Sequence, residues 1–182
     1  MRYVAGQSLQ TRVDHDGPLP VAEILRIGIQ MAAGLSAAHA QGVIHRDIKP
    51  SNILLENTVE RVLLTDFGLA RAVDDASLTQ TGILAGTPHY MSPEQASGEP
   101  VDNRSDLFSL GAVLYFMATG RPPFRAERAM AVLNRICHEP HRSVWEINAE
   151  IPDELSEIID RLLEKKQRAR FSDAVHIQEA LS

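Results

Sequence analysis

The sequence predicts a mainly α-helical domain with one small β-hairpin element beside a polar loop. Several segments show the spacing of apolar residues that is typical of helices, and one pair of short apolar runs is separated by a polar stretch. With 182 residues, of which 44% are hydrophobic and 23% are charged, the chain has the size and composition of one globular domain.

The first helix is expected from Pro20 to Gln41. Pro20 suits the first helical position, and Gly42 suits the C-terminal stop. The apolar residues of this segment fall on one face, namely Ile24, Ile27, Met31 and Leu35. Two short apolar runs follow at 53–55 and 62–64, and they predict the two strands of the hairpin.

Residues 66–91 predict one long loop, because they contain glycines and threonines and few long apolar runs. Loops of this length are usually functional. A helix start follows at "SPEQ", with Ser92 as the N-cap and Gln95 able to reach back to it. Segment 105–120 is apolar on nearly every side and predicts a helix that is buried all round. Amphipathic patterns predict further helices at about 126–138, 153–165 and 173–181.

Composition and charge argue against several classes of protein. A net charge of -6 argues against nucleic acid or an anionic membrane as the main partner. No apolar run approaches the ~20 residues that span a bilayer, and the N-terminus lacks the pattern of a secretory signal. Cys137 is the only cysteine, so no disulfide forms within the chain, and a cytoplasmic location is expected.

The polar stretch "HRDIKPSN", residues 45–52, lies between the first helix and the hairpin. Asp47 and Asn52 are five residues apart within it, and Asp66 follows the second strand in "DFG". A hairpin of this size can bring the two carboxylates and the amide together. Their oxygens are hard ligands suited to Mg²⁺, which shares its coordination with substrate phosphates. Lys49 adds a cation beside them, so the set predicts a site for a metal-bound phosphate.

Four segments, "HRDIKPSN", "DFG", "GTPHYMSPEQ" and "SDLFSLG", resemble in order and spacing the eukaryotic-type Ser/Thr protein kinases, especially their bacterial members. The resemblance covers residues 1–182 and implies a protein-kinase-like fold of which this chain holds the hinge and the C-terminal lobe only. It also implies transfer of the γ-phosphoryl group of ATP to Ser or Thr hydroxyls of protein substrates, with ATP and Mg²⁺ as cofactors.

The same resemblance implies roles for individual residues. Asp47 would accept the proton of the substrate hydroxyl, Lys49 would steady the phosphoryl group, and Thr87 would hydrogen-bond toward both. Asn52 and Asp66 would hold Mg²⁺. Leu54 would form the apolar floor under adenine, so that the residues expected to bind ATP and its metal are Arg2, Val4, Leu54, Lys49, Asn52 and Asp66.

Further residues are implied to have structural roles: His45 packed against Phe67, then Gly68, Glu94, Asp106 and Arg170. Glu94 would pair with Arg170 in a buried ion pair, which is costly to break. Asp106, near the start of the apolar helix, would accept backbone donors from the 45–52 loop, which explains a carboxylate in such surroundings. His39, at a helix end, is expected to pack or to cap that end.

Arg46, beside Asp47, suggests control by phosphorylation. The long loop contains Thr79 and Thr81 in "LTQTG". A phosphate there adds a charge of about -2 and three acceptor oxygens, which Arg46 and Arg71 could clamp. Autophosphorylation at both threonines, within a homodimer, is expected to order the loop; an unmodified flexible loop is the alternative.

Some family motifs are not in this sequence. It has no glycine-rich G-x-G-x-x-G loop, no V-A-I-K-type lysine and no partner glutamate for that lysine. We therefore expect that the N-terminal lobe, which packs on this one in the family, is missing from residues 1–182, and that these residues alone transfer little phosphate. Bacterial relatives often continue into a membrane helix, so an anchor outside this segment is compatible with a cytoplasmic kinase domain.

Two other functions stay open at this point. A pseudokinase scaffold would bind partners without catalysis, but it has no need to keep Asp47, Lys49, Asn52 and Asp66 together. A small-molecule phosphotransferase can share the H-x-D-x-x-x-x-N loop. The long threonine-bearing loop that ends in "SPE" favours a protein substrate.

Overall fold

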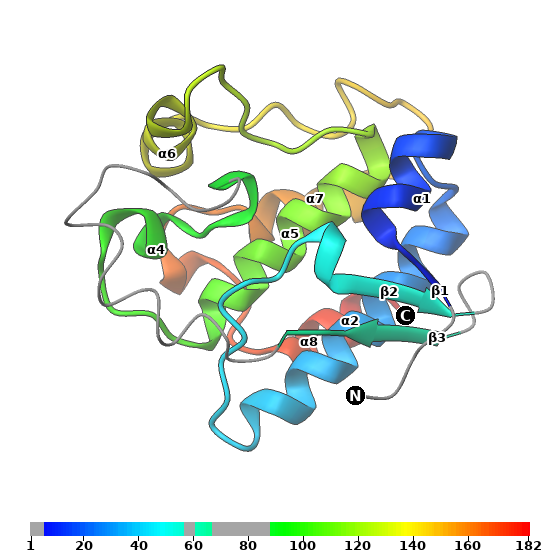
Figure 1. The fold of residues 1–182 in the computed structure, drawn as a ribbon, viewed down its shortest axis with the longest axis horizontal. Helices are drawn as coiled ribbons and strands as arrows, with labels where there is room; N and C mark the ends of the chain where they lie inside the picture. The colour runs from blue at the N-terminus through cyan, green and yellow to red at the C-terminus, as the bar shows by residue number, and fades with distance from the viewer. Residues whose placement is uncertain (1–5, 57–60, 67–87) are drawn as a thin grey trace.

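Helices make up most of the computed structural model, which describes residues 6–56, 61–66 and 88–182. In chain order the helices and strands are β1 (Gly6–Ser8), α1 (Leu9–Asp16), α2 (Val21–His39), η1 (Pro50–Asn52), β2 (Ile53–Glu56), β3 (Arg61–Leu64), η4 (Pro88–Tyr90), α4 (Pro93–Ser97), α5 (Asn103–Thr119), α6 (Ala129–His138), α7 (Asp153–Leu162), η5 (Gln167–Ala169) and α8 (Ala174–Ala180). Figure 1 shows this arrangement, with the small sheet at one side of the helices.

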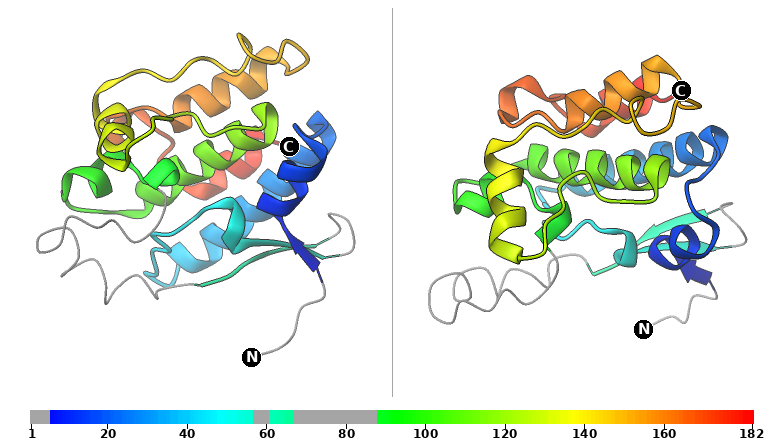
Figure 2. Two further views of the ribbon diagram at one scale, coloured as in Figure 1. Left: turned by 45° about the horizontal axis from the view of Figure 1, so that its top comes forward. Right: turned by 90° about the horizontal axis from the view of Figure 1, so that it is seen from above.

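Helix α5 runs through the middle of the molecule, between α7 on one side and α2 with the small sheet on the other (Figure 2). Residues 105–118 of this helix are all buried, as the apolar sequence predicts. A Cβ at Gly111 would lie 2.6 Å from the Cβ of Leu162, so this position must be glycine for α5 and α7 to pack so closely. The helix begins two residues before the predicted start, because the side chain of Asp102 caps it by accepting from Arg104 N.

Helix α2 shows the predicted apolar face, and its members Ile24, Ile27, Met31 and Leu35 are fully buried. This face packs mainly on α5 and α8. Length and composition alone would allow α2 to cross a membrane. In the structure it is a core helix, since its apolar face is covered by the neighbouring helices.

The predicted hairpin is present as the antiparallel pair β2–β3, with Ile53 opposite Leu64. The prediction of this hairpin is confirmed but did not include β1, which joins the other edge of β2 and makes a three-stranded antiparallel sheet. A Cβ at Gly6 would lie 2.5 Å from Leu55 O, so only glycine fits at this point of β1. Helix α1, which the prediction also missed, starts where Ser8 Oγ accepts from Thr11 N.

The three C-terminal helices lie where the amphipathic patterns place them, but each is shorter than predicted. α6 starts at Ala129 instead of about residue 126, and α7 ends at Leu162. α8 starts at Ala174, because Asp173 is its N-cap and accepts from the backbone N–H groups of Val175 and His176. Periodicity locates helices well, whereas their ends depend on caps.

Candidate active site

The segment 45–52, here named the HRD loop, brings three of the predicted functional side chains together. Lys49 Nζ donates to Asp47 Oδ2 at 2.7 Å. Asn52 Nδ2 donates to the same Oδ2 and to the backbone oxygen of Asp47, both at 2.9 Å. The turn that makes this possible is η1, in which Pro50 occupies the first turn and Asn52 N donates to Lys49 O. Within the described residues Asp47 Oδ1 receives no hydrogen bond, so it can accept from a substrate hydroxyl.

Asp66 lies next to this cluster because the hairpin returns the chain to it. The backbone N–H of Thr65 donates to Asn52 O at 2.9 Å, and Asp66 is the following residue. His45 adds a second link, since its Nε2 donates to Thr65 O at 2.9 Å. Asp66 is exposed and has a φ of 62°, a left-handed conformation that is uncommon outside glycine. The HRD loop therefore brings one carboxylate, one amide and one ammonium group together, and the hairpin places the backbone that leads into Asp66, the second carboxylate residue, beside them.

The donor atoms in this cluster fit Mg²⁺. Both Nδ2 hydrogens of Asn52 are used toward Asp47, and within the described part of the chain no donor reaches Asn52 Oδ1. This amide oxygen and the exposed carboxylate of Asp66 are the kinds of ligand that Mg²⁺ takes from proteins, with the remaining positions left to water and phosphate.

Leu54 lies outside the core, although its neighbours in β2 are buried. Ile53 and Leu55 are 0% and 2% exposed and face the helices, while Leu54 is half-buried on the opposite face of the sheet. An apolar side chain on this face is compatible with a planar ligand resting on it. The other predicted site residues lie outside the described residues: Arg2, Val4, Phe67, Gly68, Arg71, Thr79, Thr81 and Thr87.

The backbone of Arg46, within the HRD loop, has a strained conformation that contacts from other segments hold in place. Its φ is 67°, which costs free energy for any residue with a Cβ. The backbone N–H of Arg46 donates to Asp106 Oδ1 at 2.8 Å, and its backbone oxygen accepts from Gln95 Nε2 at 2.8 Å. Two side chains from distant segments thus fix this residue, which directly precedes Asp47. Strained residues held in this way are concentrated at functional sites.

Asp106 accepts hydrogen bonds from the HRD loop, as the resemblance implies. Oδ2 accepts from His45 N at 2.9 Å and from His39 Nε2 at 2.7 Å, and Oδ1 accepts from Arg46 N. The carboxylate is 1% exposed, so these three donors replace water. His39 therefore does more than pack or cap its helix, because its side chain donates a hydrogen bond to Asp106. The two residues are 67 positions apart in the sequence, and no sequence pattern indicated this contact.

We expect Asp106→Asn to lower the free energy of unfolding by about 1–3 kcal/mol, the cost of leaving a buried donor without an acceptor. An amide turns an N–H toward at least one of the three donors, so one of them loses its partner. Urea unfolding at pH 7 measures the loss. Asp102→Asn is the matched control on the same helix, because asparagine is an equally good N-cap. Equal unfolding midpoints for the two variants would contradict this account.

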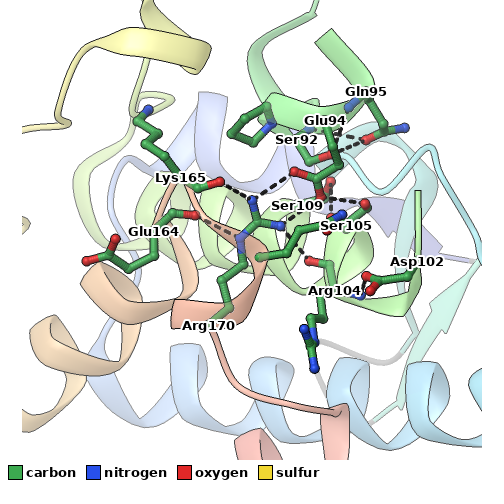
Figure 3. Close-up of polar contacts among 12 residues, drawn as sticks. Ser92, Glu94, Gln95, Asp102, Arg104, Ser105, Ser109, Glu164, Lys165 and Arg170 are labelled. Atoms are coloured by element: carbon green, nitrogen blue, oxygen red, sulfur yellow. Dashed lines mark hydrogen bonds and ion pairs between the residues drawn. The ribbon is translucent and has the colours of Figure 1, made fainter. Parts of the chain in front are cut away.

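Glu94 and Arg170 form the ion pair that the resemblance implies (Figure 3). Arg170 donates NH1 to Glu94 Oε1 at 2.8 Å and NH2 to Oε2 at 2.9 Å, and both residues are 3% exposed. Ser105 Oγ also donates to Oε1, at 2.5 Å. Burial raises the pKa of Glu94, but the hydrogen bonds from Arg170 and Ser105 and the Arg170 charge outweigh it and lower this pKa to about 2.

Helix α4 connects this buried pair to the HRD loop. The predicted capping box is present: Ser92 Oγ accepts from Gln95 N, and Gln95 Oε1 accepts from Ser92 N. The amide nitrogen of the same Gln95 donates to Arg46 O. Since Glu94 lies between Ser92 and Gln95, the ion pair fixes the turn that positions the HRD loop. The sequence predicted the capping box, but the second role of Gln95, its hydrogen bond to Arg46 O, depends on how α4 packs against the HRD loop.

Comparison with known proteins assigns the chain to a family. The model of the protein kinase domain matches residues 1–182. Relatives include a protein of Clostridium acetobutylicum named probable serine/threonine-protein kinase, which is 38% identical over 182 residues, and the serine/threonine-protein kinase PknB of Mycobacterium leprae, also 38% identical over 182 residues. The serine/threonine-protein kinase PkaA of Streptomyces coelicolor is 41% identical over 176 residues.

These alignments include 100%, 100% and 94% of this chain, respectively. They cover only 28%, 29% and 31% of the three relatives, so the chain spans less than a third of the length of each. The match of the whole chain to the domain model agrees with the ordered motifs and with the geometry of the HRD loop. The chain belongs to the protein kinase family.

Proposed function

We propose that this chain is part of a Ser/Thr protein kinase that transfers the γ-phosphoryl group of ATP to serine and threonine hydroxyls of protein substrates. The observation that carries the proposal is the convergence of Asp47, Lys49 and Asn52 in the HRD loop, with Asp66 beside them at the end of the hairpin. The named relatives are serine/threonine-protein kinases, which supports the substrate class.

Each of these side chains has a contact that suits its proposed role. Asp47 Oδ1 receives no hydrogen bond from the described residues and can accept from a substrate hydroxyl, while Oδ2 is held by Lys49 and Asn52, so the carboxylate is oriented before a substrate arrives. Lys49 keeps its ammonium group beside this carboxylate, where it can also offset charge on the transferring group. Asn52 and Asp66 would hold Mg²⁺, which supplies neutralisation of phosphate charge when bound.

We further propose that residues 1–182 contribute the hinge and C-terminal lobe and that an N-terminal lobe completes the ATP site. No glycine-rich phosphate loop or V-A-I-K-type lysine is present in the 182 residues. The small sheet would offer Leu54 as one wall for adenine, and the proposed lobe would supply the other.

Transfer of labelled phosphate from ATP tests the proposal. We expect the full-length protein to label a mixed protein substrate on serine and threonine, as phosphoamino-acid analysis would show, and chelation of Mg²⁺ to abolish the labelling. Residues 1–182 produced alone are expected to give no labelling above background. Absence of labelling by a full-length protein that contains a glycine-rich lobe would favour a non-catalytic scaffold instead.

A further inference from the structure

An arginine-lined cavity lies away from the HRD loop, between the start of α5, the end of α7, η5 and the start of α8. Its volume is about 340 Å³. The lining residues are Arg104, Arg161, Arg168, Arg170, Phe171, Ser172 and His176. Among these described residues none carries a carboxylate, although the whole chain has a net charge of -6. Such a concentration of positive charge produces a local positive potential that attracts an anion, even though the protein as a whole is acidic.

Arg170 cannot be the group that binds this anion. Its five N–H groups are all used: Nε donates to Glu164 O, NH1 to Glu94 and to Arg104 O, and NH2 to Glu94 and to Lys165 O. Figure 3 shows these bonds converging on the buried guanidinium group. Arg170 therefore has no donor left for a ligand.

The other three arginines of the cavity have their donors available. In the described part of the chain, no ion pair or side-chain hydrogen bond engages Arg104, Arg161 or Arg168. The side chain of Arg104 extends away from the Glu94–Arg170 pair in Figure 3. Three guanidinium groups that share a cavity repel one another, so an anion between them would stabilise all three.

The guanidinium group of one of these arginines and the backbone of another are also held in place before a ligand binds. The guanidinium carbon of Arg161 lies 4.1 Å from the centre of the Phe171 ring, which itself lines the cavity. Arg104 is fixed through its backbone, since its carbonyl oxygen accepts from the buried Arg170 at 3.0 Å. The nearby carboxylate of Asp173 is occupied by its helix and by His176, so it competes weakly for the arginines.

We propose that this cavity binds a phosphate group through Arg104, Arg161 and Arg168. Guanidinium groups present paired N–H donors that match the oxygens of a tetrahedral dianion. A single carboxylate has only two oxygens and could not accept from three guanidinium groups on three sides. The phosphate would be either a free ion or the phosphorylated side chain of a peptide. This inference does not depend on the proposed kinase activity.

Isothermal titration of the full-length protein with inorganic phosphate, with a phosphoserine peptide and with the same peptide unphosphorylated tests the proposal. We expect binding of at least one phosphate-bearing probe, and Arg161→Gln/Arg168→Gln should weaken it at least tenfold, because charge-assisted hydrogen bonds are the strong ones. Arg168→Gln alone should weaken it several-fold. This exposed residue has no described side-chain partner, so the single variant keeps the test valid if the double variant is unstable.

Arg125→Gln/Arg128→Gln is the matched control, because it removes two exposed arginines elsewhere and leaves the cavity intact. We expect it to bind the probes like the unaltered protein. If the phosphoserine peptide bound more than tenfold more tightly than inorganic phosphate, a phosphorylated chain would be the source of the phosphate group. If inorganic phosphate bound as tightly as the peptide or more tightly, the natural ligand would be a small anion. Absence of phosphate-dependent binding, or equal losses in the two double variants, would overturn the proposal.

Discussion

Asp47→Asn is expected to lower kcat for phosphate transfer by a factor of about 10²–10⁴, the usual contribution of a positioned general base. Asparagine keeps the size of the side chain and can still accept from Lys49 and Asn52, so the HRD loop should keep its shape. It cannot take up the proton of a substrate hydroxyl. KM for ATP should change little, because Asp47 is not among the groups proposed to hold the nucleotide. Steady-state assays of the full-length protein give both constants.

Asp160→Asn is the matched control for the loss of one carboxylate. The side chain of Asp160 is 41% exposed and is paired with His141 Nε2 at 2.8 Å, while that of Asp47 is 40% exposed and is paired with Lys49 Nζ at 2.7 Å. The two variants therefore lose the same charge at the same degree of exposure. Asp160→Asn should retain kcat within a factor of about two to three. If both variants transferred phosphate at the rate of the unaltered protein, Asp47 would not be the base.

Arg170→Met is expected to lower the free energy of unfolding by about 3–5 kcal/mol, the cost of leaving a buried charge without its partner. The variant also leaves three backbone oxygens, those of Arg104, Glu164 and Lys165, without the donor that serves them. Urea unfolding at pH 7 measures the loss. Arg142→Met breaks the exposed pair with Glu146 and should cost under about 1 kcal/mol. Similar costs for the two variants would show that burial does not determine the strength of the pair.

The pH dependence of stability separates the charge of Glu94 from its packing. The folded-state pKa of about 2 lies below the ordinary value of 4.5, so this carboxyl stabilises the protein above pH 4.5 and loses that contribution as the pH falls toward 2. In Arg170→Met the partner is absent and burial raises the pKa of Glu94. The difference in stability between the two proteins should therefore be smaller at pH 3 than at pH 7.

The sequence was sufficient for features that depend on neighbouring residues. Helix α2 followed from four apolar residues on one face, and α5 from an uninterrupted apolar segment. The capping box of Ser92 and Gln95 was visible as a spacing of three residues. The ordered motifs around Asp47, Asn52 and Asp66 were sufficient to identify the protein kinase family.

Short elements escaped prediction for a physical reason. Strand β1 has three residues, and α1 buries only Leu9 and Val13, so neither contains enough residues to show a period. Their stability comes from the partners they meet: β1 pairs with β2, and α1 packs against η1 and the sheet. The N-cap Ser8 and the glycine stop at Gly17, whose φ is 79°, were the local signs of α1 that the sequence offered.

The sequence by itself determined which residues are proposed to carry the chemistry, because a motif is a local arrangement of residue types. Only the tertiary structure decided what holds them: His39 and Asp106 meet across 67 residues, and Gln95 reaches Arg46 across 49. The arginine cavity, drawn from α5, α7, η5 and α8, was equally invisible along the chain. Hydrogen bonds and charge clusters of this kind depend on how buried helices pack, and packing is a property of the whole fold.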